Sequence, residues 1–340
     1  MADQATVLVT GGSGYIGSWC VIGLLQQGYR VKTTVRSLAK EGAARAAIAK
    51  MVDPGNRLSF HAANLTEDAG WDEEAADCEY VLHVASPLGV AEPKDPDELI
   101  VPAREGALRA IRAAIKAGAK RVVMTSSVAA TSSNAKGDSV SDETQWTDVK
   151  NPDVGAYGQS KTIAEQAAWE LIKSAGGATT LATVNPALVI GPVLGADFSE
   201  SIQVVERLVT GRVPGLPRLG FNIVDVRDVA DLHIRAMIRP EAAGQRFIAA
   251  GHWAWMGDVA AVLKAQLGAA GAKVPTRRVP DFVIRIAGLF DKDLGSVTGG
   301  LGRKHDYSSA KAQRVLGWTP RGLDETVLDC ARSLIDAGLA

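Results

Sequence analysis

The sequence predicts an α/β protein built on a doubly wound parallel sheet. Short apolar runs rich in β-branched residues alternate with helix-like segments as far as residue 185. The runs are apolar throughout, which is typical of strands that a parallel sheet buries on both faces. A glycine-rich turn joins the first of these runs to the first helical segment. Because crossovers between parallel strands are right-handed, the helices should cover both faces of the sheet.

The predicted elements follow one another in regular order. We expect strands at residues 6–10, 31–35, 58–62, 80–85, 121–126 and 180–185. Helical patterns cover residues 15–27, 39–51, 97–117 and 156–174. Gly28, Pro54, Gly118 and Gly176 follow these patterns, and glycine or proline commonly stands just beyond a helix C-terminus.

The regular alternation ends after Pro186. Proline and glycine are dense between residues 191 and 220, which indicates loops over the carboxyl edge of the sheet. A helical pattern over residues 225–237 is expected to return to the first domain. We therefore expect a first domain over residues 1–184, joined by 222–238, and a smaller C-terminal α/β lobe made of residues 185–221 and 239–340.

Composition excludes several kinds of partner. With a formal net charge of −1, the chain has no overall field that would attract nucleic acid or an anionic membrane. No stretch approaches the ~20 uninterrupted apolar residues of a membrane span, and no basic segment followed by an apolar one indicates a secretory signal. Cys20, Cys78 and Cys330 stand far apart and fit neither a disulfide framework nor a zinc site. We expect a cytoplasmic protein without a bound metal, with buried, unreactive thiols at Cys20 and Cys330.

The glycine-rich turn Thr10-Gly-Gly-Ser-Gly-Tyr-Ile-Gly17 follows the first strand directly and opens the first helix. A dinucleotide pyrophosphate binds to free backbone N–H groups at a helix N-terminus. It also needs glycine wherever a side chain would block its approach. A tight turn without a ligand is the alternative, but the strand before and the helix after favour a Rossmann-type cofactor site. The predicted contacts in this turn are Gly11, Ser13, Gly14, Tyr15, Ile16 and Gly17.

The end of the second strand indicates which dinucleotide binds. NAD-binding proteins usually place an acidic residue there, on the ribose hydroxyls, whereas an arginine accommodates the 2′-phosphate of NADP. This chain has no acid at that point; Arg36 follows the strand and Lys40 lies close behind. The alternative is a solvated surface arginine. We favour NADP(H) as the cofactor.

Tyr157 and Lys161 stand at positions i and i+4 of one predicted helix. A free phenol is a poor proton shuttle at neutral pH, but a nearby ammonium group favours its ionised form, so that Tyr157 can donate and accept protons. The same spacing recurs at Tyr307 and Lys311. Only the first pair lies between the fifth and sixth strands, where a doubly wound sheet opens its ligand crevice. We therefore interpret Tyr307 and Lys311 as structural.

Ser126 and Ser127 end the fifth strand and point to the same crevice. A hydroxyl group there can hold a substrate carbonyl oxygen, and we assign that role to Ser127. The alternative is capping of the loop that follows, and we prefer this interpretation for Ser126.

Together these motifs resemble those of the extended short-chain dehydrogenases/reductases. The resemblance is strongest to the branch of dihydroflavonol reductases, cinnamoyl-CoA reductases and bacterial and yeast carbonyl reductases, and it runs almost end to end. Besides the glycine turn, the matching segments are Val35-Arg36-Ser37, His83-Val-Ala-Ser-Pro87, Val123-Met-Thr-Ser-Ser127, Tyr157-x-x-Ser-Lys161, Asn185-Pro-Ala-Leu-Val-Ile-Gly-Pro192, Asn222-Ile-Val-Asp-Val-Arg-Asp-Val-Ala-Asp231 and Leu316-Gly-Trp-Thr-Pro320.

The resemblance implies a role for each matching residue. Ser127, Tyr157 and Lys161 would form the catalytic triad, and Arg36 would contact the 2′-phosphate. The other implied cofactor contacts are Asn64 and Leu65 at the adenine, Val84, Ala85 and Ser86 at the ribose, Pro186 to Val189 at the nicotinamide, and Ser201 at the pyrophosphate.

The chain also departs from the family patterns. Asn64 stands where many relatives carry aspartate. Ala103 stands where many short-chain dehydrogenases carry asparagine, so a proton relay through that asparagine is not implied here. Phe221 and Asn222 stand where nucleotide-sugar epimerases carry an Arg-Asp pair, so the clamp on a sugar diphosphate is missing.

The sequence therefore predicts an NADPH-dependent reductase that transfers a hydride to the carbonyl carbon of a small aldehyde or ketone, with Tyr157 as the proton donor. Two alternatives stay open: a nucleotide-sugar epimerase or dehydratase with bound NAD, and a non-catalytic sensor that binds the dinucleotide. A monomer and a homodimer are both compatible with the sequence. Aromatic residues that could line an apolar substrate pocket, or simply belong to the core, are Phe198, Phe221, Trp253, Trp255 and Phe290.

Overall fold

The computed structural model describes residues 5–87, 93–132, 137–195, 199–290, 295 and 298–340. Its central element is a seven-stranded sheet in the order β10-β7-β5-β4-β1-β2-β3, in which every neighbouring pair is parallel. The predicted doubly wound sheet is thereby confirmed. Its strands are β1 (Thr6–Thr10), β2 (Arg30–Val35), β3 (Leu58–Ala62), β4 (Tyr80–His83), β5 (Arg121–Thr125), β7 (Thr180–Pro186) and β10 (Gln245–Ala249).

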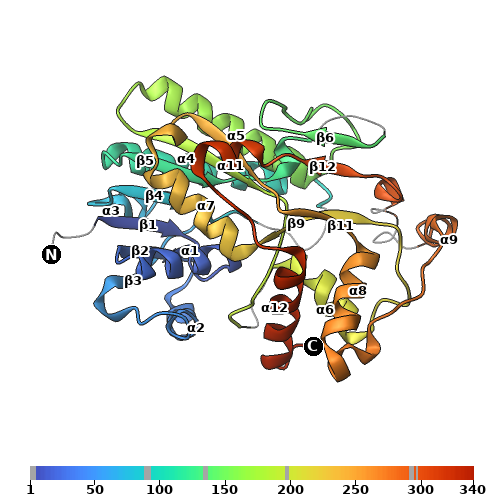
Figure 1. Ribbon diagram of the computed structural model, residues 1–340. Coiled ribbons are helices and arrows are strands. Elements are labelled where there is room, and N and C mark those ends of the chain that lie inside the picture. Colours follow the sequence, from blue (N-terminus) through green and yellow to red (C-terminus); the bar gives the residue numbers. More distant parts are fainter. Residues whose placement is uncertain (1–4, 88–92, 133–136, 196–198, 291–294, 296–297) are drawn as a thin grey trace.

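Helices cover both faces of this sheet (Figure 1). On one face lie α1 (Tyr15–Gln26), α2 (Glu41–Ala49) and α7 (Val226–Ile238), and on the other lie α3 (Trp71–Ala75), α4 (Asp97–Lys116) and α5 (Ala156–Ala175). Strand β1 contributes to both layers, because Val7 and Val9 belong to the core cluster under the first set of helices and Leu8 to the cluster under the second. Side chains alternate between the faces of a strand, so a strand buried on both faces must be apolar throughout.

The winding of the sheet changes direction between β1 and β4. Strand β1 pairs with β2 on one side and with β4 on the other, although β4 comes later in the chain than β3. Doubly wound sheets bind ligands at the carboxyl ends of the strands that flank such a point. The turns after β1, β2, β4, β5 and β7 all open at this edge, because the strands are parallel.

A smaller sheet contains β11 (His252–Trp255), β9 (Gly220–Asp225) and β8 (Leu188–Ile190) in that order. Strand β9 is antiparallel to β11 and parallel to β8. Nearby helices α6 (Gln203–Thr210), α8 (Met256–Gln266) and α12 (Leu323–Asp336) pack together (Figure 1). The remaining described strands and α-helices are β6 (Ser139–Ser141), which pairs with β12 (His305–Tyr307), and the helices α9 (Asp281–Ala287) and α11 (Ala310–Leu316).

Two expectations about the second half of the chain need correction. Strand β10 comes from the segment assigned to the smaller lobe, yet it pairs with β7 in the central sheet. Its apolar run from Phe247 to Ala250 is buried like the earlier strands, but it stands outside the regular alternation. The region in which loops were expected also contains α6, whose Val205, Leu208 and Val209 are buried, so a short amphipathic helix forms between the proline- and glycine-rich stretches.

Three further properties concern the whole described chain. No helix in it is long and apolar enough to cross a membrane. All three cysteines are buried, and burial raises the pKa of Cys20 and of Cys330 to about 12, so both thiols stay protonated as expected. Within the described ranges, no group of His, Cys, Asp and Glu side chains is arranged to hold a metal ion.

Candidate active site

Glycine residues shape the turn between β1 and α1. Gly11 has a left-handed backbone with φ +71°, and a Cβ there would lie 3.0 Å from the Cβ of Ala85. A Cβ on Gly17 would lie 2.2 Å from the carbonyl oxygen of Gly11. No side chain caps α1, which begins after Gly14, and its first turn carries no acidic residue. This end of the helix therefore suits an anionic pyrophosphate, as the glycine motif predicts.

The other predicted contacts in this turn differ in exposure. Ser13 and Ile16 are half-buried, whereas the Tyr15 side chain is buried in the core. Its phenol oxygen has no hydrogen-bond partner among the described residues, and burial raises the pKa of Tyr15 well above its usual value of 10. A cofactor contact at Tyr15 would therefore involve its backbone rather than its hydroxyl group.

Thr10, the last residue of β1, holds the turn that follows β4 through hydrogen bonds. Its hydroxyl oxygen accepts hydrogen bonds from the backbone N–H groups of Val84 and Ala85, each at 3.0 Å. Its proton is donated to Nδ1 of His83, also at 3.0 Å. Burial lowers the pKa of His83 to about 4, with a further effect of Lys161, so the ring is neutral and can accept this bond. The turn after β4, which also contains the half-buried Ser86, is thereby held beside the glycine turn.

Arg36 and Lys40 are exposed just beyond the carboxyl end of β2. Arg36 forms no ion pair with any residue that the structure describes. The predicted contact of Arg36 with the 2′-phosphate of NADP stays a prediction.

Asn64 and Leu65 follow β3 and have local partners. The Asn64 side chain donates from Nδ2 to Oε1 of Glu67 at 2.8 Å and accepts the backbone N–H of Thr66 at 3.2 Å. Leu65 packs against α4, because a Cβ added to Gly106 of that helix would lie 2.8 Å from the Cβ of Leu65. The Asn64 amide would have to leave its present bonds before it could turn toward an adenine.

Pro186 and Val189 are buried where β7 and β8 meet at the same edge. Ser201 is half-buried, and its hydroxyl group donates to the carbonyl oxygen of Val189 at 2.5 Å. Ser201 therefore already has an acceptor, and a pyrophosphate oxygen would compete with it.

The three predicted catalytic residues lie on two neighbouring elements. Ser127 follows β5, and Tyr157 and Lys161 lie in the first turns of α5, where the ammonium nitrogen is 5.7 Å from the centre of the Tyr157 ring. A Cβ on Gly158 would be 3.9 Å from the carbonyl oxygen of Ala129, so the start of α5 adjoins the Ser127 turn. Tyr157 is 37% exposed, whereas Ser127 and Lys161 are only 7% and 6% exposed. The phenol is thus accessible to a substrate, while the nearby ammonium group is shielded.

The two serines at the end of β5 form different hydrogen bonds. The Ser127 oxygen accepts the backbone N–H of Ala129 at 3.1 Å and caps the short helical turn there. Ser126 instead donates to Oε2 of Glu165 at 2.6 Å, so the capping role preferred for Ser126 is wrong. Because the Ser127 oxygen acts as an acceptor in its cap, its own proton is left to be donated to a substrate oxygen.

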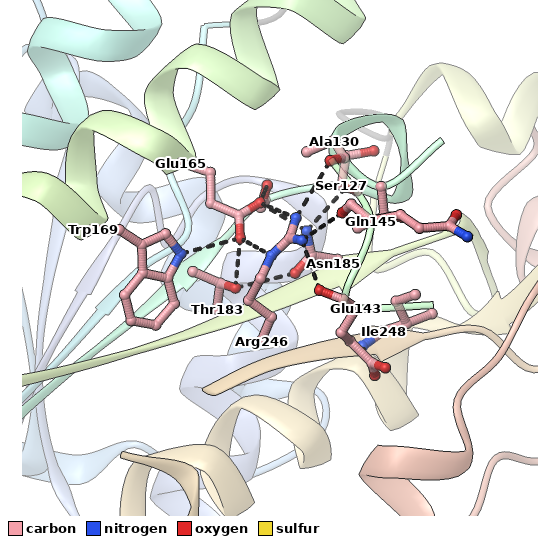
Figure 2. A network of polar contacts seen from close by, with 12 residues as sticks. Ser127, Ala130, Glu143, Gln145, Glu165, Trp169, Thr183, Asn185, Arg246 and Ile248 are labelled. Carbon is pink, nitrogen blue, oxygen red and sulfur yellow. Dashed lines mark hydrogen bonds and ion pairs between the residues drawn. The ribbon is translucent and has the colours of Figure 1, made fainter. Parts of the chain in front are cut away.

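A buried polar network lies behind the Ser127 turn (Figure 2). At its centre Arg246 of β10 binds Glu165 of α5 through two contacts, Nε to Oε1 at 2.7 Å and Nη2 to Oε2 at 3.2 Å. Thr183 donates to Oε1 at 2.8 Å, and Asn185 donates to Oε2 at 2.9 Å. A bidentate arginine with added donors satisfies a carboxylate that has no access to water.

This network also holds the backbone around Ser127. Asn185 donates from Nδ2 to the carbonyl oxygen of Ser127 at 3.1 Å. Arg246 donates to the carbonyl oxygens of Glu143 and Gln145 at 2.9 and 2.7 Å. The sequence motifs did not indicate this network, although Glu165 shares a helix face with Tyr157 and Lys161, where a buried charged side chain needs a partner.

A cavity of about 370 Å³ adjoins the active site. Its wall includes Val128, which follows Ser127, and the aromatic residues Phe221, Trp253 and Tyr307. Phe290 is 88% exposed, Trp255 is not among the described wall residues, and Phe198 lies outside the described part of the chain. A second cavity of about 410 Å³ lies against α8, away from every predicted site residue.

Tyr307 and Lys311 do not repeat the Tyr157–Lys161 arrangement. The Tyr307 hydroxyl shares a hydrogen bond of 2.9 Å with Oγ of Ser132, and burial raises the pKa of its phenol. The Lys311 ammonium lies 5.4 Å from the centre of the Phe247 ring. Tyr307 therefore belongs to the cavity wall, and the Lys311 ammonium lies over Phe247.

Comparison with known proteins identifies the family. Residues 7–250 match the NAD dependent epimerase/dehydratase family, so the chain belongs to that family. It is 40% identical over 249 residues to cinnamoyl-CoA reductase CAD2 of Medicago truncatula, covering 70% of this chain and 74% of that protein. It is 36% identical over 274 residues to dihydroflavonol 4-reductase of Zea mays, covering 77% of this chain and 74% of that protein.

A solved structure supports the same placement. The yeast methylglyoxal/isovaleraldehyde reductase Gre2, determined in complex with NADPH, superposes with a TM-score of 0.81 and 25% sequence identity. The match covers 98% of this chain and 100% of the Gre2 chain. The predicted resemblance to extended short-chain dehydrogenases/reductases and the Rossmann fold are both confirmed.

Proposed function

We propose that this protein is an NADPH-dependent reductase of aldehydes or ketones. The observation that carries the proposal is the exposed Tyr157 phenol beside the shielded Lys161 ammonium, at an edge that also contains Ser127 and a substrate-sized cavity. The similarity to plant and yeast reductases supports the same activity.

The residues at the sheet edge fit NADPH. The glycine turn can form in this shape only with glycine at both positions, because a Cβ on Gly11 would crowd Ala85 and a Cβ on Gly17 would collide with the carbonyl oxygen of Gly11. Its backbone N–H groups at the start of α1 would hold the pyrophosphate. Arg36 would pair with the 2′-phosphate, and Lys40 adds positive charge nearby. Lys161 would hold the nicotinamide ribose, and the turn after β4 would line it. When bound, the cofactor supplies the hydride that is added to the carbonyl carbon.

The side chains of the protein supply the rest of the reaction. Ser127 donates its hydroxyl proton in a hydrogen bond to the carbonyl oxygen and fixes the angle of the substrate. Tyr157 transfers its phenolic proton to that oxygen as negative charge develops there, and the phenolate left behind lies beside the Lys161 ammonium. One hydride and one proton convert the carbonyl group to an alcohol, and solvent then restores the proton of Tyr157.

Two other functions are less well supported. In a nucleotide-sugar epimerase, bound NAD is recycled and a cation clamps the sugar diphosphate; here Phe221 lines the cavity and Asn222 bonds the backbone of His305. A non-catalytic sensor would not need Ser127, Tyr157 and Lys161 together. Purified protein that retains NAD and is inert toward added NADPH would favour the epimerase.

The test is an NADPH-oxidation screen over aromatic aldehydes, β-ketoesters and flavonoid-like ketones. We expect turnover by the wild type, and a loss of about 10²–10⁴-fold in kcat for Tyr157→Phe with cofactor binding preserved, because the proton donor is removed. Tyr307→Phe is the matched comparison and should lose less than about tenfold, because that hydroxyl is bonded to Ser132. If Tyr307→Phe lost more activity than Tyr157→Phe, the assignment of Tyr157 as the proton donor would be wrong.

A further inference from the structure

The cavity beside the active site has a single cation in its described wall. Arg303 lies there among glycines and apolar side chains, and no aspartate or glutamate is among the wall residues that the structure describes. The wall residues with amide, imidazole or phenol groups are Asn222, His305 and Tyr307. Burial lowers the pKa of His305, so its ring is neutral at physiological pH. A ligand therefore meets one positive charge and no negative charge from the described wall.

The guanidinium of Arg303 has no partner in the part of the chain that the structure describes. Arg303 is exposed, and its side chain makes no hydrogen bond, ion pair or ring contact with any described residue. The acids beside it bind Lys304 instead: Asp138 accepts the backbone N–H of Lys304 at 2.8 Å, and Asp306 pairs with the Lys304 ammonium at 3.3 Å. Arg303 is thus free to turn its planar, bidentate donor group toward an anion in the cavity.

The backbone around Arg303 is held on both sides. Gly302 has φ +72°, and its N–H donates to the carbonyl oxygen of Arg218 at 2.8 Å. The N–H of Arg303 itself donates to the carbonyl oxygen of Gly300 at 3.3 Å. Strand β12 begins at His305 and pairs with β6. Because the turn is already held, pairing with an anion would order only the arginine side chain and not the backbone.

We infer that the substrate carries a carboxylate group that pairs with Arg303. The carbonyl group of such a substrate would face Ser127, beside Val128, and its carboxylate would reach Arg303 in the same wall. Leu188 and Phe221 suit the apolar frame between the two groups. A cavity of about 370 Å³ is at the small end of ligand pockets, so both groups belong to one compact molecule. The inference rests on the proposed function and narrows its substrates to aldehyde acids and keto acids.

Substrates that differ in charge but hardly in shape test this inference. We would measure kcat and KM with 3- and 4-carboxybenzaldehyde and with their neutral amides, 3- and 4-formylbenzamide. In the wild type, KM for at least one acid should be lower than KM for its amide by about fivefold or more, as expected for an ion pair at an accessible site. Arg303→Met keeps the aliphatic stem without the charge and should abolish this difference. The kcat values should change little, because the contact lies away from the reacting carbonyl.

The matched control is Lys304→Met, which removes the neighbouring cation from outside the described wall. It should leave the ratio of the two KM values within about twofold of the wild type, because a charge without direct contact is screened by solvent and salt. An acid and an amide that bind equally in the wild type overturn the inference. A preference for the acid that survives Arg303→Met, or that is lost equally in Lys304→Met, overturns it too.

A binding measurement decides the inference without turnover. Calorimetric titration at saturating NADP would use 3- and 4-(hydroxymethyl)benzoate and the two corresponding amides, which are the alcohol products of the four aldehydes. One acid should bind more tightly than its amide, and Arg303→Met should remove the difference. Equal affinities of acid and amide overturn the carboxylate site even if carbonyls are reduced. If no carbonyl is reduced, the proposed function fails, and the titration still decides the carboxylate site.

Discussion

Two sets of buried polar side chains adjoin the active site, and they differ in how fully they are hydrogen-bonded. Each carboxylate oxygen of Glu165 accepts from Arg246 and from at least one further donor. Asn222 and Trp253, in the cavity wall, each present an atom with no partner among the described residues. A satisfied network specifies one arrangement of the backbone, whereas a buried polar atom without a partner costs free energy and specifies none. Substitutions in the first set should therefore lower the free energy of unfolding more than substitutions in the second set.

Breaking the Glu165–Arg246 pair should give the largest effect. Arg246→Met keeps the aliphatic stem but leaves the Glu165 carboxylate without its buried cation, which should lower the free energy of unfolding by about 3–5 kcal/mol. Urea unfolding measures the change. Restoring charge balance with Glu165→Gln/Arg246→Met should recover part of the loss, and a single-variant loss below about 1 kcal/mol would show that the network is not fully buried in solution.

Two buried histidines extend the comparison to pH. Burial lowers the pKa of both His83 and His233 to about 4, and His233 is held by Thr125 and by the backbone of Val229, each at 2.7 Å. An unfolded histidine binds its proton near pH 6.5, so stability is complete above that value and falls between pH 6.5 and pH 4. Each residue should contribute about 3 kcal/mol of this loss.

The matched variant for this effect is His233→Gln. Its unfolding free energy, measured by urea titration from pH 7.5 to pH 4, should fall less steeply than that of the wild type, because one proton fewer is taken up on unfolding. Parallel curves for the two proteins would mean that His233 is protonated in the folded state.

Arg36 is a third case, a cation with no ion-pair partner among the described residues that is exposed to water rather than buried. Solvent satisfies it, so Arg36→Ala should leave the unfolding free energy within about 0.5 kcal/mol of the wild type. The same change should raise the KM for NADPH about tenfold to a hundredfold and spare NADH, because a charge-assisted contact contributes about 1.5–3 kcal/mol. Steady-state kinetics with both cofactors measure the effect. An equal rise in KM for NADPH and NADH would show that Arg36 does not contact the 2′-phosphate.

Local patterns predicted most of the first half of the fold. Apolar runs marked β1, β4, β5 and β7 because these strands are buried on both faces, and the i, i+4 spacing placed Lys161 beside Tyr157. The sheet position of β10 and the role of Ser126 could not be read in the same way. Both depend on contacts such as that between Glu165 and Arg246, which are 81 residues apart in the chain. Burial of a lone charged residue signals that a partner exists, but only the packed structure shows which residue it is.

Hydride transfer itself tests the proposed function most directly. NADPH carrying deuterium at C4 of the nicotinamide, as each stereoisomer in turn, would be incubated with the protein and an aldehyde that it reduces. We expect one isomer to deliver deuterium to the carbinol carbon, with one alcohol formed for each NADPH consumed, and Tyr157→Phe to form that labelled alcohol at least a hundredfold more slowly. Substrate that is altered without consumption of NADPH, or an alcohol that carries no deuterium from either isomer, would contradict the assignment of this protein as a carbonyl reductase.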